Sequence, residues 1–439
     1  MTTYHITQPQ GLHSDVKLPA SKSISNRALI IYALTGADAI LPENLSDCDD
    51  TEVIIRALKA LRRQDNTDVA SQASDLKPQT TIDIMAAGTA MRFMTAFLAA
   101  TDSGEHLLTG TERMKHRPIK VLVDALRQLG AHIEYEGEEG YPPLRISGRQ
   151  LAGGQLEIAG NVSSQYISAL LLIGPVLSQG LTLHLTGDII SRPYIDLTLW
   201  TMREFGAQAE WTAVDTIEVK PQPYKPRRYY IENDWSAASY WYEMVALTDD
   251  PDVCIRLEGL MDGSKQGDSS VRYIFSLLGV KTTFASKKPG QPTTVTLKKN
   301  GHCVPRLEYD FVNAPDLAQT IVCTCCAKGI PFKFMGLQTL KIKETDRLLA
   351  LRTELAKLGY DIKDENGCQL SWDGSLAPQS STLTTRPSID TYNDHRMALA
   401  FAPLALRQPI DINNPSVVTK SYQQFWEHLQ QAGFTIEES

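Results

Sequence analysis

The sequence has no hydrophobic run long enough to cross a membrane as a helix. Its two most apolar stretches, Tyr166–Leu177 and Met397–Leu406, are far below the ~20 residues that a membrane span needs, and each contains a proline. The first residues, Met1–His5, also lack the basic region and apolar stretch of a secretion signal. We therefore expect a cytoplasmic protein in which the two apolar stretches form buried helices.

An excess of positive charge is also absent, because 43 Lys and Arg residues face 51 Asp and Glu residues, a formal net charge of -8. A chain that is acidic overall is a poor partner for nucleic acid or for an anionic membrane. Any anionic ligand must therefore be held by a local concentration of Lys and Arg. Hydrophobic residues make up 42% of the 439 residues, which excludes a disordered chain and favours two or three domains.

The usual nucleotide and metal signatures are missing. No predicted strand leads into a GxxxxGK phosphate loop or a GxGxxG motif. Seven cysteines, an odd number, do not suggest a disulfide framework. Cys323, Cys325 and Cys326 lie close together, but no CxxC pair or nearby His accompanies them. We interpret this cluster as small side chains of a buried helix and expect no metal site.

A repeated pattern is present along most of the chain: a helix-like run ends in Gly and a strand-like run follows. Its glycines, 73 to 80 positions apart, are Gly130, Gly206, Gly279, Gly359 and Gly433. Glycine suits the left-handed residue that closes a helix. About 20 residues before each glycine, a strand-like run ends in a turn and a polar loop. The period predicts six α/β units, too many for one core, and so two similar lobes with a ligand site between them.

Basic and hydroxyl residues gather at four predicted helix starts, at 19–27, 86–92, 113–118 and 162–166. In the first, Lys22 and Arg27 stand beside hydroxyl caps where the helix dipole adds positive potential, which suits a phosphate or carboxylate. An ordinary capped or solvated helix start is the alternative interpretation of each stretch.

Two later motifs combine cations with carboxylates. Lys343 and Arg347 are four residues apart, so they would share a face of a helix, with Glu344 beside them. A surface network of ion pairs is the alternative. The stretch 392–398 opens an apolar helix with Asp, His and Arg, which is costly for buried groups unless they are paired or used.

Taken in order, these segments resemble the 5-enolpyruvylshikimate-3-phosphate (EPSP) synthase family of enolpyruvyl transferases. The matching motifs are SKSISNR at 21–27, AGTAMR at 87–92, RMKHRP at 113–118, VSSQ at 162–165, SRPYID at 191–196, PD at 315–316, KETDR at 343–347, NDHRMA at 393–398 and TK at 419–420. The resemblance implies an α/β fold of two lobes, each an inside-out α/β barrel of three βαβαββ units. Residues 20–233 would form the N-terminal lobe, and residues 1–19 with 234–439 the C-terminal lobe. The active site would lie in the cleft between the lobes of a monomer.

The resemblance also implies a reaction: the enolpyruvyl group of phosphoenolpyruvate moves to the 5-hydroxyl of shikimate 3-phosphate and phosphate is released, without cofactor or metal. The residues implied to hold shikimate 3-phosphate are Lys22, Ser23, Arg27, Ser163, Ser164, Gln165, Ser191, Asp316 and Lys343. Those implied to hold phosphoenolpyruvate are Lys22, Gly88, Arg117, Gln165, Arg347, His395, Arg396 and Lys420.

For the proton transfers, our hypothesis is that Asp316, helped by Lys22, takes the 5-hydroxyl proton and that Glu344 protonates the methylene carbon. Two residues depart from the family pattern, since Ala86 and Thr339 stand where it usually has Asn. Gly88 retains the small residue that leaves room for the competitive inhibitor glyphosate, so we expect sensitivity to it.

Two other functions compete with this interpretation. The sister family that acts on UDP-N-acetylglucosamine typically has Lys-Asn at the first helix and a Cys in a mobile loop, whereas this chain has Lys22-Ser23 and no Cys at 113–118. A non-catalytic anion-binding scaffold would need no carboxylates among its cations, which Asp316 and Glu344 argue against.

Overall fold

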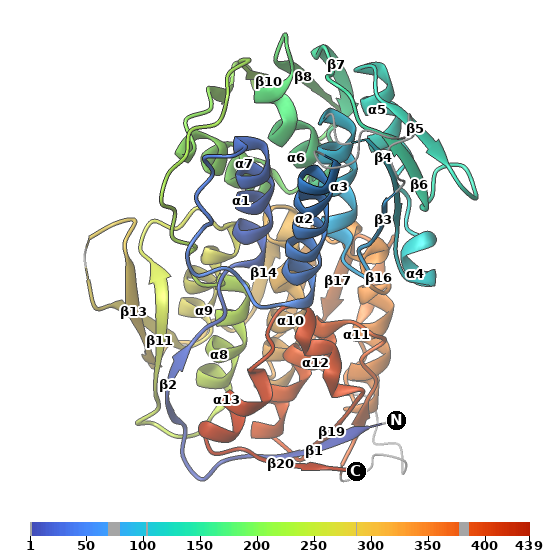
Figure 1. Cartoon of the computed structure of the whole chain (residues 1–439). Coiled ribbons are helices and arrows are strands. Elements are labelled where there is room, and N and C mark those ends of the chain that lie inside the picture. The colour runs from blue at the N-terminus through green and yellow to red at the C-terminus, as the bar shows by residue number, and fades with distance from the viewer. Residues whose placement is uncertain (1, 69–79, 102–103, 287, 377–385) are drawn as a thin grey trace. The chain divides into compact units, whose positions relative to one another are not determined.

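The computed structural model describes residues 2–68, 80–101, 104–286, 288–376 and 386–439 as a mixed α/β protein (Figure 1). It divides into two compact units. One is continuous, Ser21–Ile231, and the other combines Met1–Ala20 with Glu232–Ser439, so the chain passes between the units twice. Over the described ranges, no helix has both the length and the apolarity to cross a membrane.

The unit Ser21–Ile231 contains two four-stranded sheets, with the orders β3-β4-β6-β5 and β7-β8-β10-β9. Their strands are β3 (Thr80–Asp83), β4 (Glu105–Thr109), β5 (His132–Tyr135), β6 (Leu144–Ser147), β7 (Gly154–Ala159), β8 (Leu181–Thr186), β9 (Ala209–Trp211) and β10 (Thr216–Val219). The helices are α1 (Lys22–Thr35), α2 (Asp49–Asp68), α3 (Gly88–Ala100), α4 (Glu112–Lys115), α5 (Lys120–Gln128), α6 (Ser164–Ile173) and α7 (Arg192–Glu204), and the 3₁₀ turn η1 (Gly174–Val176) follows α6.

The other unit contains three four-stranded sheets, with the orders β12-β13-β11-β2, β14-β15-β17-β16 and β18-β19-β1-β20. Their strands are β1 (Thr3–Thr7), β2 (His13–Lys17), β11 (Cys254–Met261), β12 (Val280–Phe284), β13 (Pro292–Lys299), β14 (Leu307–Asp310), β15 (Phe332–Met335), β16 (Lys363–Glu365), β17 (Gln369–Trp372), β18 (Ser388–Ile389), β19 (Ile410–Asn413) and β20 (Thr435–Glu438). The α-helices are α8 (Trp235–Leu247), α9 (Val271–Leu277), α10 (Ala318–Lys328), α11 (Arg347–Lys357), α12 (His395–Phe401) and α13 (Phe425–Gln431). The 3₁₀ turns are η2 (Gly267–Ser270), η3 (Phe311–Asn313), η4 (Pro315–Leu317), η5 (Gln338–Ile342), η6 (Ala402–Leu406) and η7 (Pro415–Lys420).

All five sheets share one pattern of strand pairing. Each contains one parallel pair, β3-β4, β7-β8, β2-β11, β14-β15 or β18-β19, and two antiparallel pairings complete it. In two sheets the N-terminal segment supplies a strand, because β2 lies beside β11 and β1 lies between β19 and β20. Strand residues alternate between core and surface, as in β8, where Leu181, Leu183 and Leu185 are buried.

The predicted helix–glycine–strand pattern is confirmed five times. The glycines follow α5, α7, α9, α11 and α13 and precede β5, β9, β12, β16 and β20. All five have φ between 85° and 103°, the left-handed region that closes a helix without a steric cost only for glycine.

The most apolar helices lie inside their units, as predicted. Tyr166–Leu177 forms most of α6 and the turn η1, and Met397–Leu406 forms most of α12 and η6. A helix that is apolar on every side must be covered on every side, and α6 packs on α3 and α7 while α12 packs on α10. The three clustered cysteines are also buried, on α10 (Figure 1), and burial raises the pKa of each thiol.

Candidate active site

The site residues implied by the sequence fall into two groups, one in each compact unit. The unit Ser21–Ile231 carries Lys22, Ser23, Arg27, Gly88, Arg117, Ser163, Ser164, Gln165 and Ser191. The other unit carries Asp316, Lys343, Glu344, Arg347, His395, Arg396 and Lys420. Each group is built from its own helix starts and loops.

The first group begins at the N-terminus of α1, where the predicted capped helix start is confirmed. The Ser21 hydroxyl accepts from the Ile24 N–H at 3.5 Å. Lys22 Nζ lies 3.1 Å from Asp50 Oδ2 of α2. This ion pair holds the lysine at a helix end whose dipole favours anions.

Arg27 lies inside the unit and joins three helices. Its Nε donates to Thr198 Oγ1 of α7 at 2.7 Å, and its Nη1 donates to the Ser23 carbonyl at 2.8 Å. Its Nη2 donates to Ser168 Oγ of α6 at 3.3 Å and to the Tyr194 carbonyl at 3.1 Å. Burial lowers the pKa of Arg27 to about 10, so the group stays charged at neutral pH. These four acceptors are hydroxyls and carbonyls, and none of them neutralises that charge.

Gly88 and Arg117 lie against each other at the start of α3. A Cβ built on Gly88 would lie 2.5 Å from Arg117 Nη1. Arg117 Nε is buried and has no hydrogen-bond partner among the described residues. A buried donor without a partner is costly, and an anion at this helix start would satisfy it. Arg92 donates to the Gly88 and Pro118 carbonyls at 3.1 Å each, which ties the Arg117 loop to α3.

The remaining residues of this group lie at two further helix starts. Ser163 caps α6 by accepting from the Gln165 N–H at 3.3 Å, and Gln165 Nε2 donates to Thr89 Oγ1 of α3 at 3.0 Å. This contact places Gln165 beside Gly88. Ser191 precedes α7 and is buried with φ of 54°, a left-handed conformation that costs a non-glycine residue about 1–3 kcal/mol and tends to occur at functional sites.

In the other unit, the Arg347 guanidinium lies among three carboxylates. Its Nε and Nη2 contact Asp394 Oδ2 and Oδ1 at 2.7 and 3.2 Å. Its Nη2 also donates to Glu344 Oε2 at 2.9 Å, and its Nη1 donates to Asp316 Oδ1 at 3.1 Å. Burial opposes the charge, but the three carboxylates outweigh it and raise the pKa of Arg347 above its ordinary value.

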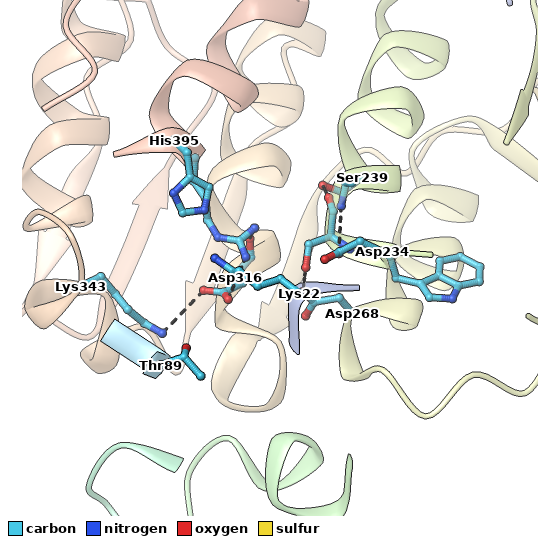
Figure 2. A network of polar contacts seen from close by, with 12 residues as sticks. Lys22, Thr89, Asp234, Ser239, Asp268, Asp316, Lys343 and His395 are labelled. Atoms are coloured by element: carbon cyan, nitrogen blue, oxygen red, sulfur yellow. Dashed lines mark hydrogen bonds and ion pairs between the residues drawn. The ribbon is translucent and has the colours of Figure 1, made fainter. Parts of the chain in front are cut away.

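Asp316 is held by cations on several sides. Arg396 Nη2 lies 2.9 Å from Oδ2, and Lys343 Nζ lies 3.7 Å from Oδ1, the contact drawn as a dashed line in Figure 2. Burial raises the pKa of Asp316, but Arg396, Lys343 and Arg347 together lower it more, so it lies well below its ordinary value. The group is therefore a carboxylate, able only to accept protons and hydrogen bonds at neutral pH.

One prediction about this group is wrong: Lys343 and Arg347 do not share a helix face. Helix α11 begins at Arg347 because Asp346 caps it, accepting from the Leu348 and Leu349 N–H groups at 3.1 Å. Lys343 lies before the cap in extended backbone. Both cations nevertheless contact the Asp316 carboxylate.

The prediction for the start of α12 is confirmed. Asp394 caps the helix by accepting from the Arg396 N–H at 2.9 Å, and all seven helix residues are buried. His395 Nδ1 lies 3.7 Å from Asp394 Oδ1. Lys420, at the end of η7, donates from Nζ to the Asn393 carbonyl at 3.3 Å, directly before the cap. No group of three His, Cys, Asp or Glu residues within the described ranges is arranged to hold a metal ion.

Two carboxylates of this site were not among the candidate residues. Asp394 anchors Arg347 although 47 positions separate them, and the sequence marked it only as part of the helix start. Asp268, on η2, is buried and accepts from the Ser236 hydroxyl (Figure 2). Burial, and then the negative charge of Asp316, raise the pKa of Asp268 to about 6. In the sequence, Asp268 is marked as a candidate only by its position in a polar loop before a helix.

Comparison with known proteins identifies the family. Residues 6–429 match the family model described as EPSP synthase (3-phosphoshikimate 1-carboxyvinyltransferase). The chain belongs to the EPSP synthase family. A 3-phosphoshikimate 1-carboxyvinyltransferase of Bacteroides fragilis is 54% identical over 434 residues, which cover 99% of this chain and 98% of the relative. The enzyme of that name from Haemophilus influenzae is 35% identical, with 96% of each chain covered.

Solved structures show the same fold at low identity. An EPSP synthase from Acinetobacter baumannii has a TM-score of 0.76 at 20% identity and covers 100% of both chains. The enolpyruvyl transferase NikO from Streptomyces tendae has a TM-score of 0.70 at 16% identity, covering 100% of this chain and 99% of that chain. These likenesses agree with the mixed α/β architecture.

The two departures from the EPSP synthase pattern have different surroundings. Thr339 lies on η5, and its Oγ1 is buried without a hydrogen-bond partner among the described residues. Ala86 is half-buried two residues before α3, next to Met85, whose φ is 54°. The Thr339 hydroxyl is therefore available to a polar group, whereas Ala86 contributes only its backbone.

Proposed function

We propose that this member of the EPSP synthase family transfers the enolpyruvyl group of phosphoenolpyruvate to the 5-hydroxyl of shikimate 3-phosphate. The observation that carries the proposal is a carboxylate, Asp316, kept ionised by Arg396, Lys343 and Arg347, with Glu344 on the same arginine. Phosphate binding alone needs cations. Acids fixed among those cations supply the proton transfers that this reaction requires.

We propose further that the two compact units correspond, within one or two residues at each crossing, to the two lobes expected at residues 20–233 and at residues 1–19 with 234–439. The pairing pattern shared by five sheets, two in the unit Ser21–Ile231 and three in the other unit, supports an assembly of βαβαββ units, which we propose to be three per lobe in an inside-out barrel. Both substrates would bind in the cleft between the lobes, where closure positions two reactants and excludes water.

In this proposal the residues divide by ligand. Shikimate 3-phosphate is held by Lys22, Ser23, Arg27, Ser163, Ser164, Gln165, Ser191, Asp316 and Lys343. Phosphoenolpyruvate is held by Lys22, Gly88, Arg117, Gln165, Arg347, His395, Arg396 and Lys420. The contact of Gly88 with Arg117 and the bond from Gln165 to Thr89 support a shared anion site at the start of α3.

The chemistry is an addition followed by an elimination. The 5-hydroxyl oxygen bonds to the enol carbon while Asp316, helped by Lys22, takes the hydroxyl proton. Glu344 in its protonated form gives its proton to the methylene carbon, and the enol carbon becomes the centre of a tetrahedral ketal. The carbon–oxygen bond to phosphate then breaks, and the departing phosphate takes the proton held by Asp316. The methyl group returns a proton to Glu344, which restores the double bond and leaves both carboxyl groups as they began. The lowered pKa of Asp316 keeps the group deprotonated but makes it a weak base, so the position of Asp316 among the cations, and not its pKa, supports its role as the proton acceptor.

The test is phosphate release from phosphoenolpyruvate with different acceptors. We expect release with shikimate 3-phosphate and none with UDP-N-acetylglucosamine. Release with the nucleotide sugar alone would assign the chain to the sister chemistry, and release with neither would leave an anion-binding scaffold.

Cytoplasmic location and a monomeric state complete the proposal. Both substrates are phosphate esters, whose charge keeps them in the compartment where they are made. Cell fractionation and light scattering check these points, the second against the chain mass of 48.7 kDa.

A further inference from the structure

A turn of unusual backbone conformation leads into α12. The Asp394 N–H donates to the Thr391 carbonyl at 2.8 Å, and the two residues inside the turn, Tyr392 and Asn393, have φ of 54° and 55°. Positive φ at both central positions suits Gly, Asn or Asp. It is unfavourable for a bulky residue such as Tyr, so the turn needs support from elsewhere in the structure.

That support comes from a buried carboxylate on α11. Glu354 is 0% exposed, and its Oε1 accepts from the Tyr392 hydroxyl at 2.6 Å. Its Oε2 accepts from the Asp390 N–H at 3.0 Å and lies 2.6 Å from Lys357 Nζ. Hydrogen bonds to an ionised acceptor are stronger than neutral ones, so this carboxylate fixes both the approach to the turn and its first central residue.

The same helix holds the other end of the turn. Arg347 precedes Glu354 by seven residues, two helical turns, so both side chains project from one face of α11. Arg347 binds the Asp394 carboxylate and Glu354 binds Tyr392. Helix α11 therefore holds the segment 390–394 at Asp390 and Tyr392 through Glu354 and at Asp394 through Arg347.

The turn also positions two cations of the site, Arg396 and Lys420. Asp394 caps α12 and so fixes the first turn of the helix that carries Arg396. The Asn393 carbonyl accepts from Lys420 Nζ at 3.3 Å, and Asn393 Oδ1 accepts from Asn414 Nδ2 at 2.8 Å. A flip of either left-handed residue would move both contacts.

We propose that Glu354 and Tyr392 are positioning residues for phosphoenolpyruvate binding: their hydrogen bond holds the turn in the conformation that aligns Arg347, Arg396 and Lys420. The inference rests on the proposed function for the identity of the ligand. Neither residue is placed in contact with substrate, and both act through the turn.

The experiment compares Tyr392→Phe and Glu354→Gln with a matched control, Tyr242→Phe. Tyr242 is buried in the same unit, and its hydroxyl bonds to Thr282 Oγ1 at 2.9 Å, away from the turn. For each protein we would measure kcat, the KM for phosphoenolpyruvate, the urea midpoint, and the shift of that midpoint by phosphoenolpyruvate alone.

We expect Tyr392→Phe to raise the KM for phosphoenolpyruvate roughly ten-fold, the effect of one lost charge-assisted hydrogen bond, with kcat changed less than about three-fold. Glu354→Gln should raise it at least as much. The double variant should show less than the product of the two effects, because both remove one interaction. The control should lower the urea midpoint and leave KM unchanged.

An unchanged KM and an unchanged ligand-induced shift in Tyr392→Phe, with stability lowered as in the control, would overturn the positioning role. If the wild-type protein binds phosphoenolpyruvate but releases no phosphate with shikimate 3-phosphate, the proposed function fails while the shift measurement still decides this proposal. No binding by the wild-type protein would overturn both.

Discussion

The two compact units hold their site cations in opposite ways. In the unit Ser21–Ile231, Arg27 donates to hydroxyls and carbonyls, and Arg117 Nε has no partner among the described residues; Lys22, paired with Asp50, is the exception. In the other unit, Arg347 and Arg396 contact carboxylates. The first arrangement leaves positive charge for an anion to neutralise. In the second arrangement, the positive charges are paired with carboxylates and keep them ionised. We therefore propose that the first unit contributes cations for anion binding, whereas the second combines such cations with the carboxylates proposed for proton transfer.

The largest expected effect comes from Asp316→Asn in the second unit. Loss of the proton acceptor should lower kcat roughly 10²–10⁴-fold. Phosphate release with saturating substrates measures the effect, and the urea midpoint separates it from unfolding, because Arg396 and Arg347 also lose a partner. A variant that is folded and retains kcat within a few-fold would mean that the carboxylate is only structural, and the contrast between the units would collapse.

Glu344→Gln should be next in size. Gln keeps a polar contact to Arg347 but cannot deliver a proton, so we expect kcat to fall roughly 10²-fold or more. Incorporation of solvent deuterium into the methylene carbon should fall in parallel, and mass spectrometry of recovered phosphoenolpyruvate measures it. Turnover near the wild-type rate would show that another group protonates this carbon.

Gly88→Ala tests the binding side of the contrast. The added Cβ would lie 2.5 Å from Arg117 Nη1 and would displace the flexible end of that side chain. We expect the KM for phosphoenolpyruvate to rise roughly ten-fold with little change in kcat, because uniform binding is lost. We predict that glyphosate inhibits the wild-type protein. Its inhibition of this variant should weaken by a factor similar to the rise in KM. Gly137→Ala is the control, since its Cβ would meet only Pro143 at 4.0 Å. A fall in kcat at unchanged KM would contradict the division of roles.

The smallest effect concerns pH and Asp268. Its pKa is raised from 3.8 to about 6 by burial and then by Asp316, so the folded state binds the proton more tightly than the unfolded state. Its contribution to stability is therefore full below about pH 4 and is lost as the pH rises through about 6. Asp268→Asn should remove this decline, worth roughly 1–3 kcal/mol because one pKa unit is about 1.4 kcal/mol.

Urea unfolding between pH 4 and pH 7 measures this change. Asp316, whose pKa is lowered, acts in the opposite sense, since its contribution is present above about pH 4 and is lost as the pH falls further. An unchanged slope in Asp268→Asn would show that Asp268 is ionised throughout this range.

Local features of the fold were predictable from the sequence. The five repeat glycines mark helix ends because only glycine takes the left-handed conformation without cost, and the apolar helices are buried because they have no polar face. The helix over Lys343–Arg347 was predicted wrongly because the capping preference of Asp346 outweighs the charge spacing.

Contacts between distant segments were not predictable in the same way. Asp394 and Arg347 are 47 positions apart, and no spacing rule joins them. The raised pKa of Asp268 comes from its burial and from the charge of Asp316. Neither can be inferred from the sequence of the loop that contains Asp268. The approach of Arg117 to Gly88 likewise depends on how two loops fold together.

The placement of β1 has a consequence for the order in which the protein can fold during synthesis. Strand β1 pairs with β19 and β20, so its partners are synthesised about 400 residues after it. The side chains of Thr3 and Asn413, for example, form a hydrogen bond although 410 positions separate them. The unit Ser21–Ile231, in contrast, is continuous in sequence. On the ribosome we therefore expect this unit to fold first, while β1 stays unpaired until β19 and β20 have emerged.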